Sequence, residues 1–372
     1  MTREQIIWLT IGVYAVFIFV VGFLSNSKSK NMGDFTVGGR NAGAWMSAFS
    51  YGTAYFSAVM FIGYAGGTGW KYGIWGVLPG IGNAIIGSLF AWMVLAKRTR
   101  SVTREKGITS MPQFFEKCYG SRAMKLFSAI VIFVFLLPYS ASVYKGLTSV
   151  CSVLLGIDEW ICMLVIAVAG ALIVVAGGYM AALKADFIQG AVMLVGVIVL
   201  IFSVINSDNV GGLTEGFKNI ASETSKLSLN AFDHIGLWAT VLMTSFGTWG
   251  LPQMIHKYYG IRDDKEVSRG TVISTVFAFV VAGGGYLIGS LSHLFFNELP
   301  EGGTDYLVPN LLIKSGVSDI LVGVILVLLI AASVSTLSSV TITAASTLTM
   351  DIVQDRFIKD KEKDISLLTK IV

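Results

Sequence analysis

Charged residues are scarce in this chain. Only 13% of its 372 residues are Asp, Glu, Lys or Arg, against about one quarter in a typical soluble domain, which excludes an ordinary water-soluble globular protein. Cysteine and histidine are rarer still, with three of each. The cysteines lack CxxC spacing and no two histidines are spaced like metal ligands. Neither a disulfide framework nor a zinc site is therefore indicated.

Long apolar runs take the place of charge. Hydrophobic residues make up 54% of the chain, and its mean hydropathy is +0.72. A run of about twenty apolar residues is long enough to cross a bilayer as a helix. The sequence therefore predicts an all-α polytopic membrane protein with nine spans, at approximately Ile6–Leu24, Trp45–Tyr64, Ile74–Ala96, Met124–Leu155, Trp160–Val175, Phe187–Asn206, Gly236–Leu251, Thr271–Leu294 and Ile320–Met350.

Positive charge gathers in alternate loops between these spans. Of the 27 Lys and Arg residues, 21 fall on one side, including Lys184 and Lys257, and five fall on the other. The remaining one, Lys145, lies inside the fourth span. Because Lys and Arg concentrate in cytoplasmic loops, we expect the N-terminus outside and the C-terminal tail in the cytoplasm. The predicted location is the plasma membrane, with the lipid bilayer as surroundings.

Two of the nine spans are unusual for helices in lipid. The second (AFSYGTAYFSAVMFIGYAGG) carries Gly52 among tyrosines and hydroxyls, and the seventh (ATVLMTSFGTWGLP) ends in Gly250 and Pro252. Glycine and proline favour an unwound backbone, which survives at membrane depth only beside a cavity or inside protein. With the first span set aside, the two broken helices are the first and sixth, which indicates inverted repeats around a binding site. The alternative is two ordinary helices packed closely through glycine.

The ninth span is rich in hydroxyls. Ten of the seventeen residues from Ser333 to Thr349 are Ser or Thr. At 100° per residue, several fall on one stripe. A hard monovalent cation is bound by neutral oxygens at short range, so the stripe predicts a sodium site completed by carbonyls from the broken second span. The alternative is helix packing, with each hydroxyl bonded to its own helix. The stripe consists of Ala332, Ser335, Thr336, Ser339, Thr343 and Ser346.

Four segments carry a resemblance to a known family. GGRNAGAWMSAFSYGTAYFSAVMFIGYAGG, KADFIQG, GTWGLPQMIHKYYGIRDDKEVSRG and AASVSTLSS resemble the sodium:solute symporter family, in order and spacing, from about residue 6 to 355. The resemblance implies a LeuT-like inverted-repeat fold in a single transporter domain over 1–372. An extra N-terminal helix (6–24) precedes the first five-helix repeat (45–206), and 236–350 supplies three helices of the second. Because that repeat is incomplete before the tail (351–372), we expect a C-terminally truncated, defective or unstable chain.

The resemblance also implies the ion-binding residues. Family members bind their main sodium ion through backbone oxygens of the first broken helix and hydroxyls of the eighth core helix. Some hold a second ion beside an aspartate, a pattern that this sequence keeps, so we favour two sodium ions per cycle. Asp186 has an alternative role in its helix's first turn, where a carboxylate complements the helix dipole. The matching residues are Thr53, Phe56, Ala332, Ser335 and Thr336 for site one, and Asp186, Ser335, Ser338 and Ser339 for site two.

The resemblance places the solute between the broken helices. The matching positions offer hydroxyls, one amide and aromatic surface but no fixed charge, so we expect a small polar or carboxylated organic solute of the pantothenate- or proline-like class. Lys145, six residues beyond Tyr139, either draws an anionic solute into a vestibule or extends its ammonium to the outer interface. The expected solute residues are Tyr55, Ser57, Asn83, Tyr139, Thr244, Thr248 and Trp249.

These features together predict a sodium-coupled importer that works by alternating access, with Na⁺ as the coupling ion. An enzyme is disfavoured, since GIGNAIIG (80–87) fails the GxGxxG pattern inside a span and HExxH and GxSxG motifs are missing. A sodium channel or a solute sensor on a transporter scaffold are the alternatives, because hydroxyl-lined ion sites also serve pores. No feature indicates a nucleic acid or an obligate protein as partner.

Overall fold

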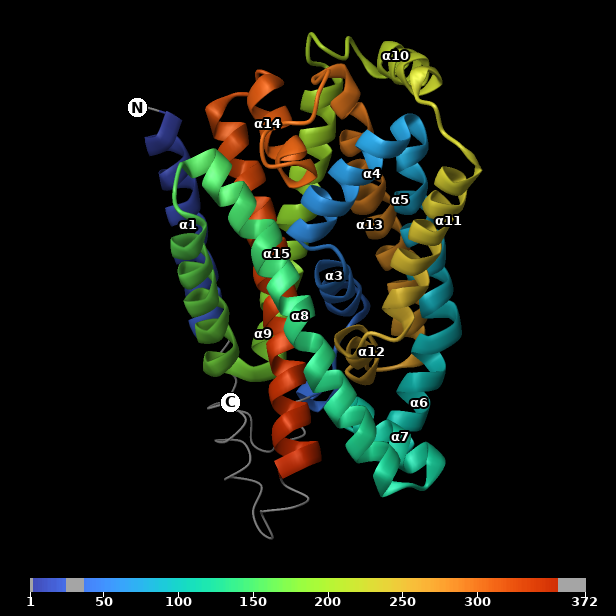
Figure 1. Ribbon diagram of the computed structural model, residues 1–372. Helices are drawn as coiled ribbons and strands as arrows, with labels where there is room; N and C mark the ends of the chain where they lie inside the picture. Colours follow the sequence, from blue (N-terminus) through green and yellow to red (C-terminus); the bar gives the residue numbers. More distant parts are fainter. Residues whose placement is uncertain (1–2, 25–36, 354–372) are drawn as a thin grey trace.

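The computed structural model describes residues 3–24 and 37–353, and nearly all of this part of the chain is helical (Figure 1). Within it, the strand-like pairing is one isolated parallel bridge between Ala42 and Ile261. The α-helices are α1 (Arg3–Leu24), α3 (Ala44–Tyr55), α4 (Ala65–Tyr72), α5 (Leu78–Gly82), α6 (Lys97–Glu105), α7 (Met111–Tyr119), α8 (Arg122–Leu155), α9 (Glu159–Ile205), α10 (Leu213–Lys226), α11 (Ala231–Phe246), α12 (Pro252–Tyr259), α13 (Asp264–Leu291), α14 (Leu307–Lys314) and α15 (Asp319–Ser346).

Short 3₁₀ and π segments connect several of these helices, and π segments are frequent at functional sites. The first of the π segments continues α3 after a break, and the last continues α15. The 3₁₀ segments are η1 (Gly38–Arg40), η3 (Gly73–Val77), η6 (Gly247–Trp249), η7 (Ser292–Leu294) and η8 (Thr304–Tyr306), and the π segments are η2 (Met60–Tyr64), η4 (Asn83–Phe90), η5 (Trp92–Ala96) and η9 (Thr347–Val353).

The helices form one bundle with α3 inside it. Helices α9, α13 and α15 pack against α3, and α10 and α14 lie at one end of the bundle, with α6 and α7 at the other (Figure 1). The described chain starts with α1 at the end that carries α14 and finishes with η9 near α7. This arrangement places the break after α3 in the interior, whereas the break after α11 has Phe246, Gly247 and Gly250 exposed.

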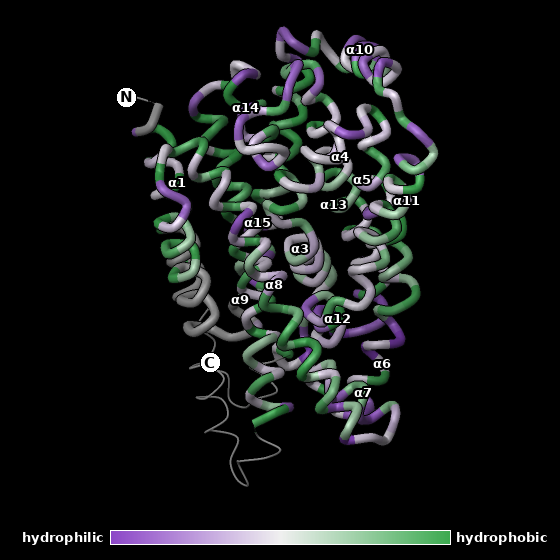
Figure 2. The backbone as a smooth tube through the Cα atoms, viewed as in Figure 1, coloured by the Kyte–Doolittle hydropathy of each residue, from purple (hydrophilic) through white to green (hydrophobic). Residues whose placement is uncertain are grey.

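Hydrophobic residues predominate along the helices of the bundle, and hydrophilic residues gather at its two ends (Figure 2). Five helical stretches in the described ranges are long and apolar enough to cross a membrane: residues 60–105, 122–155, 182–205, 264–294 and 319–353. The polytopic membrane protein is therefore confirmed, and the count of nine spans stays a prediction. Large apolar side chains that face outward include Met93, Phe127, Phe135, Leu164 and Phe202.

The 47 residues of α9 do not follow one straight axis. In Figure 1 this segment descends beside α1, turns at the bottom of the bundle and rises again. The sequence predicted two spans separated by an inner loop around Lys184, and the helical segment does change direction, although its backbone stays helical throughout. Of its described apolar parts, Ala182–Ile205 is long enough to cross a membrane, and Glu159–Val168 is shorter.

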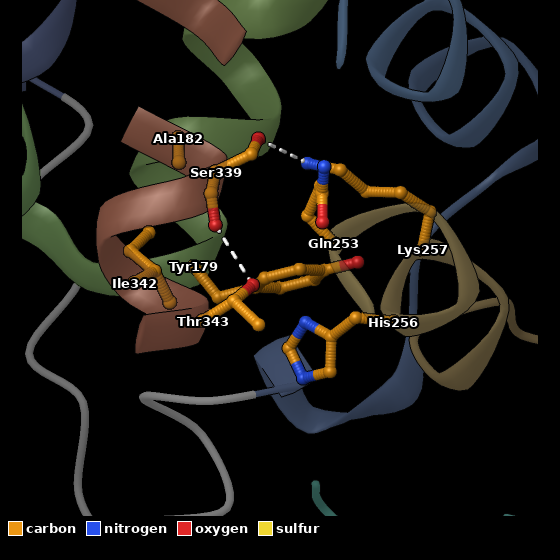
Figure 3. A pocket seen from close by; sticks show the side chains of 8 residues that line it. All are labelled: Tyr179, Ala182, Gln253, His256, Lys257, Ser339, Ile342 and Thr343. Atoms are coloured by element: carbon orange, nitrogen blue, oxygen red, sulfur yellow. Dashed lines mark hydrogen bonds between the residues drawn. The ribbon is translucent and has the colours of Figure 1, made fainter. Parts of the chain in front are cut away.

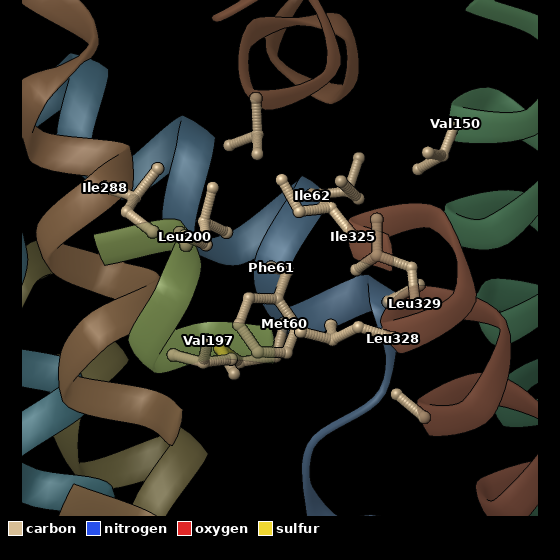
Figure 4. Packing of buried hydrophobic residues seen from close by; sticks show 14 of the residues in the cluster. Met60, Phe61, Ile62, Val150, Val197, Leu200, Ile288, Ile325, Leu328 and Leu329 are labelled. Carbon is tan, nitrogen blue, oxygen red and sulfur yellow. The ribbon is translucent and has the colours of Figure 1, made fainter. Parts of the chain in front are cut away.

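The interior is a large apolar cluster around the upper half of the broken second span. Figure 4 shows Met60, Phe61 and Ile62 packed among side chains of α9, α13 and α15. Glycine lets the neighbouring helices approach closely, because a Cβ at Gly289 of α13 would lie 2.0 Å from the carbonyl oxygen of Ala65 in α4. Such backbone contact is typical of helix packing in membranes.

The start of α3 is hydrogen-bonded to the start of α13 and the segment before it, near the end of the bundle that carries α6 and α7. The amide of Ala42 donates to the carbonyl of Gly260 at 2.9 Å, and the amide of Arg262 donates to Ala42 at 3.0 Å. The amide of Ala44, in the first turn of α3, donates to Glu266 Oε2 at 2.7 Å. These bonds fix the first broken helix beside the chain that leaves the second.

Candidate functional site

The first broken helix ends at Tyr55, and the chain is non-helical at Phe56 and Ser57 before helical backbone resumes. Phe56 is extended (φ −105°, ψ 92°), and its amide donates the last bond of α3 to the carbonyl of Gly52. The break thus lies four residues beyond Gly52, which is in helical conformation. Gly52 serves packing instead, since a Cβ there would lie 2.4 Å from the Phe277 ring.

The second broken helix is interrupted where the sequence predicts. Helix α11 ends at Phe246, a single 3₁₀ turn follows over Gly247–Trp249, and α12 begins at Pro252. Gly250 lies in the non-helical connection between η6 and α12. Proline fits the first position of a helix because that position needs no amide donor. The break therefore has a local cause.

The hydroxyl face of α15 meets the end of α3. Thr336 Oγ1 lies 2.9 Å from the carbonyl oxygen of Thr53 and 3.0 Å from that of Ala332. Ser335 Oγ lies 2.8 Å from Thr53 Oγ1, and all four residues are buried. The Thr53 carbonyl has no helical amide to accept from, because α3 ends two residues later. Four of the five residues expected at sodium site one are thus brought together, and Phe56 lies at the break beside them.

A third hydroxyl of α15 contacts the chain on the far side of the same break. Ser333 Oγ accepts from the backbone amide of Ala58 at 3.3 Å. This amide is one of those that a new helical segment leaves without a partner. Sequence reasoning included Ser333 in the hydroxyl-rich segment but gave it no role.

Asp186 of α9 is the centre of the second group of residues. Its side chain is only 1% exposed. One carboxylate oxygen lies 2.5 Å from Ser335 Oγ, and the other accepts from Ser50 of α3. Sequence reasoning missed Ser50, although its hydroxyl lies one turn before Thr53 on the same helix.

A lysine also faces this aspartate. The ammonium of Lys257 in α12 donates to Asp186 Oδ2 at 3.1 Å and to Ser339 Oγ at 2.9 Å. The sequence-based placement of Lys257 in an inner loop is therefore wrong: its side chain is 4% exposed, because the break at Gly250 turns α12 into the bundle. Ser338, also expected at site two, is buried with no hydrogen-bond partner among the described residues.

A small polar cavity adjoins this ion pair on the side of α12 (Figure 3). It is lined by Tyr179, Gln253, His256, Lys257, Ser339 and Thr343, with Ala182 and Ile342. Lys257 reaches across it to Ser339, and its ammonium lies 5.7 Å from the centre of the Tyr179 ring. The side-chain amide of Gln253 and the hydroxyl of Tyr179 are buried without a described partner.

Most of the expected solute residues lie together between the two broken helices. Tyr55 donates its hydroxyl to the carbonyl of Thr244 at 2.9 Å, and Thr244 Oγ1 lies 3.0 Å from Asn83 Oδ1. Trp249 donates its indole N–H to the carbonyl of Ile86 at 2.9 Å. These contacts join α3, η4, α11 and η6 into one polar wall that carries no charged side chain.

The remaining expected residues are placed less directly. Thr248 is buried in η6 and bonds the carbonyl of Ser245 at 2.8 Å. Ser57 is buried at the first break, and Tyr139 of α8 packs against the apolar core. Lys145 forms an ion pair with Glu159 at 2.8 Å with its own side chain 55% exposed, so a nearby carboxylate already balances its charge.

Comparison with known proteins agrees with this architecture. A model of the sodium:solute symporter family matches residues 35–372. The osmoregulated proline transporter of Bacillus subtilis (strain 168) is 25% identical over 370 residues, covering 97% of this chain and 73% of the relative. The sodium/pantothenate symporter of Haemophilus influenzae is 24% identical over 382 residues, covering 98% and 76%.

A solved structure shares the fold. The substrate-bound outward-open state of a Na⁺-coupled sialic acid symporter superimposes with a TM-score of 0.84 at 18% identity, covering 98% of this chain and 77% of the other. At this identity the likeness establishes the fold, which is the all-helical transporter fold expected from the sequence.

Proposed function

The chain belongs to the sodium:solute symporter family, and from that premise we propose that it imports a small polar organic solute driven by sodium bound at the break in α3. The family is one of transporters, and Na⁺ is the coupling ion. We propose in addition the inward direction of transport, the solute class, and the residues that bind the ion and the solute. The observation that carries the proposal is the hydrogen bond that Thr336 donates to the carbonyl of Thr53 at the end of α3.

The proposed sodium site consists of the oxygens that converge at this break. Carbonyls of Thr53, Phe56 and Ala332 and hydroxyls of Ser335 and Thr336 would surround the ion. Neutral oxygens suit a hard monovalent cation, and a buried site with several short oxygen contacts needs only small movements to enclose it. In the structure Thr336 already lies 2.9 and 3.0 Å from two of these carbonyls.

The proposed solute site is the polar wall beside the same break. Tyr55, Asn83 and Thr244 supply hydroxyl and amide groups, with Ser57 and Thr248 nearby, and Tyr139 and Trp249 supply aromatic surface. Because none of these side chains carries a charge, a zwitterionic or carboxylated solute would be held by hydroxyls and by backbone groups that the two breaks leave unpaired. Relatives that transport proline and pantothenate support this solute class.

Alternating access follows from the position of both sites at broken helices. We propose that the repeats comprise residues 45–206 and 236–350, with 6–24 as an added helix and the N-terminus outside. Both breaks are anchored at one end, where Ala42 pairs with the chain around Ile261. The halves of the broken helices beyond this anchor are the parts that can move to open either side.

The test is solute uptake by the full chain in proteoliposomes. Radiolabelled proline, pantothenate and sialic acid are supplied with an inward gradient of NaCl, and with choline chloride as control. We expect uptake of one of them, or of a chemically similar solute that competes, only with sodium. Asn83→Ala should weaken uptake at least tenfold in apparent affinity, because the amide that joins Thr244 and Ser245 is lost. Asn206→Ala, at an exposed amide, should not.

Two results would contradict the proposal. Uptake that is equal in sodium and in choline would remove sodium coupling. A ²²Na⁺ flux that does not saturate with sodium concentration and continues without any solute would instead indicate a channel.

A further inference from the structure

The residues expected to form sodium site two already contact a positively charged side chain. Lys257 enters it from α12 and contacts two of the four residues expected to bind a second sodium ion, Asp186 at 3.1 Å and Ser339 at 2.9 Å. Both members of the ion pair are buried, with 4% and 1% of their side chains exposed. A buried ion pair of this kind persists only when each charge has close partners.

We propose that the Lys257 ammonium replaces the second sodium ion, so that this chain binds and couples one sodium ion at the break in α3. The inference rests on the proposed function of that first site. It assigns to Lys257 the role of a tethered cation, and it replaces the expectation of two sodium ions per cycle.

The chemistry of the position supports this assignment. An ammonium carries the same charge as a sodium ion and offers three donors. Two of these go to Asp186 and Ser339, and the Tyr179 ring lies beside it. The carboxylate oxygens of Asp186 are also satisfied, since Ser335 and Ser50 contact them in addition to the lysine. A sodium ion there would need the same oxygens and would meet a like charge.

The proposal implies that a second sodium site would form if the Lys257 ammonium were removed. Without the ammonium, Asp186 would remain as a buried carboxylate beside the hydroxyls of Ser335 and Ser339, and Ser338 adds a buried hydroxyl with no described hydrogen-bond partner. One carboxylate and several hydroxyls are a suitable ligand set for a hard monovalent cation. Removing the ammonium should therefore create a second sodium site.

The experiment counts sodium ions per chain. Saturation binding of ²²Na⁺ is measured on purified full-length protein in nanodiscs, with choline chloride to keep the ionic strength constant. We expect one ion for the wild type, two for Lys257→Met and one for the double variant Lys257→Met/Asp186→Asn, in which the carboxylate is neutral. Lys97→Met is the matched control: Lys97 pairs with Asp264 at 3.4 Å but is exposed, so one ion is expected.

The outcomes separate this inference from the proposed function. Two ions in the wild type, or one ion in a folded Lys257→Met protein, overturn the tethered cation. No saturable binding in the wild type overturns the sodium site at the break in α3 instead. If Lys257→Met does not fold, the wild-type count still decides the question, and the charge-neutral double variant tests whether one ion binds without the pair.

Discussion

Replacing Thr336 by alanine removes a hydroxyl of the proposed sodium site, where α15 contacts the end of α3. The oxygen of this hydroxyl lies 2.9 Å from the Thr53 carbonyl and 3.0 Å from that of Ala332. In the sodium-bound state this oxygen is one of the five proposed ligands of the ion, and a polar contact to a charged group contributes about 1.5–3 kcal/mol. Since about 1.4 kcal/mol corresponds to a factor of ten, we expect the sodium Kd to rise about 10- to 100-fold.

The effect is measurable as ligand-induced stability. A ligand at 100 times its Kd stabilises the folded state by about 2.7 kcal/mol. At the same concentration, a Kd raised 10- to 100-fold leaves about 1.4 to 0.4 kcal/mol. We would therefore record unfolding in NaCl and in choline chloride at equal ionic strength and compare the difference between the two salts. This difference cancels the loss of stability that the missing hydrogen bond causes without sodium.

Two variants serve as controls for this measurement. Thr336→Ser keeps the hydroxyl and should retain most of the sodium-dependent stabilisation. Thr341→Ala removes a threonine from an exposed position of the same helix and should behave as the wild type. The reasoning is refuted if Thr336→Ala keeps the full sodium response in a folded protein, or if Thr341→Ala loses as much of it.

Three further substitutions test neighbouring parts of the structure. A Cβ at Gly87 would lie 2.1 Å from the Tyr55 hydroxyl, so Gly87→Ala should displace that side chain and weaken solute affinity in uptake assays, while sodium-dependent stabilisation persists. Ser333→Ala removes the acceptor for the Ala58 amide and should lower the free energy of unfolding by about 1–3 kcal/mol. An unchanged free energy of unfolding would contradict a stabilising role for this hydrogen bond. Gly289→Ala forces two touching backbones apart and should cost about 1–3 kcal/mol in thermal unfolding; an unchanged melting temperature would contradict the close approach.

The sequence predicted the parts of this molecule that have local causes. The break before α12 follows from Gly250 and Pro252, whose backbone preferences act within a few residues. The hydroxyl face of α15 follows from helical periodicity, which placed Ser335 and Thr336 on one side. Both features were therefore visible without any knowledge of the partner helices.

The features that the sequence did not predict depend on contacts between distant residues. The break in α3 lies at Phe56 and Ser57, where neither glycine nor proline occurs, and hydroxyls of α15 hold both of its sides. Lys257 was counted as an inner-loop charge because hydropathy cannot show that α12 turns inward. Its partner Asp186 is 71 positions away, and no local pattern connects the two residues.

Ser335 links the proposed sodium site to the ion pair. Its hydroxyl lies 2.8 Å from Thr53 Oγ1 and 2.5 Å from Asp186 Oδ1, so an ion bound at the first site shares an oxygen with the environment of Asp186. Because Lys257 is on α12, any movement of that helix away from α9 separates a buried ion pair, which is costly unless water or another cation enters. The second broken helix is thus tied by charge to the hydroxyls that hold the first. We therefore expect that sodium bound at the proposed site influences the movement of the second broken helix without touching it.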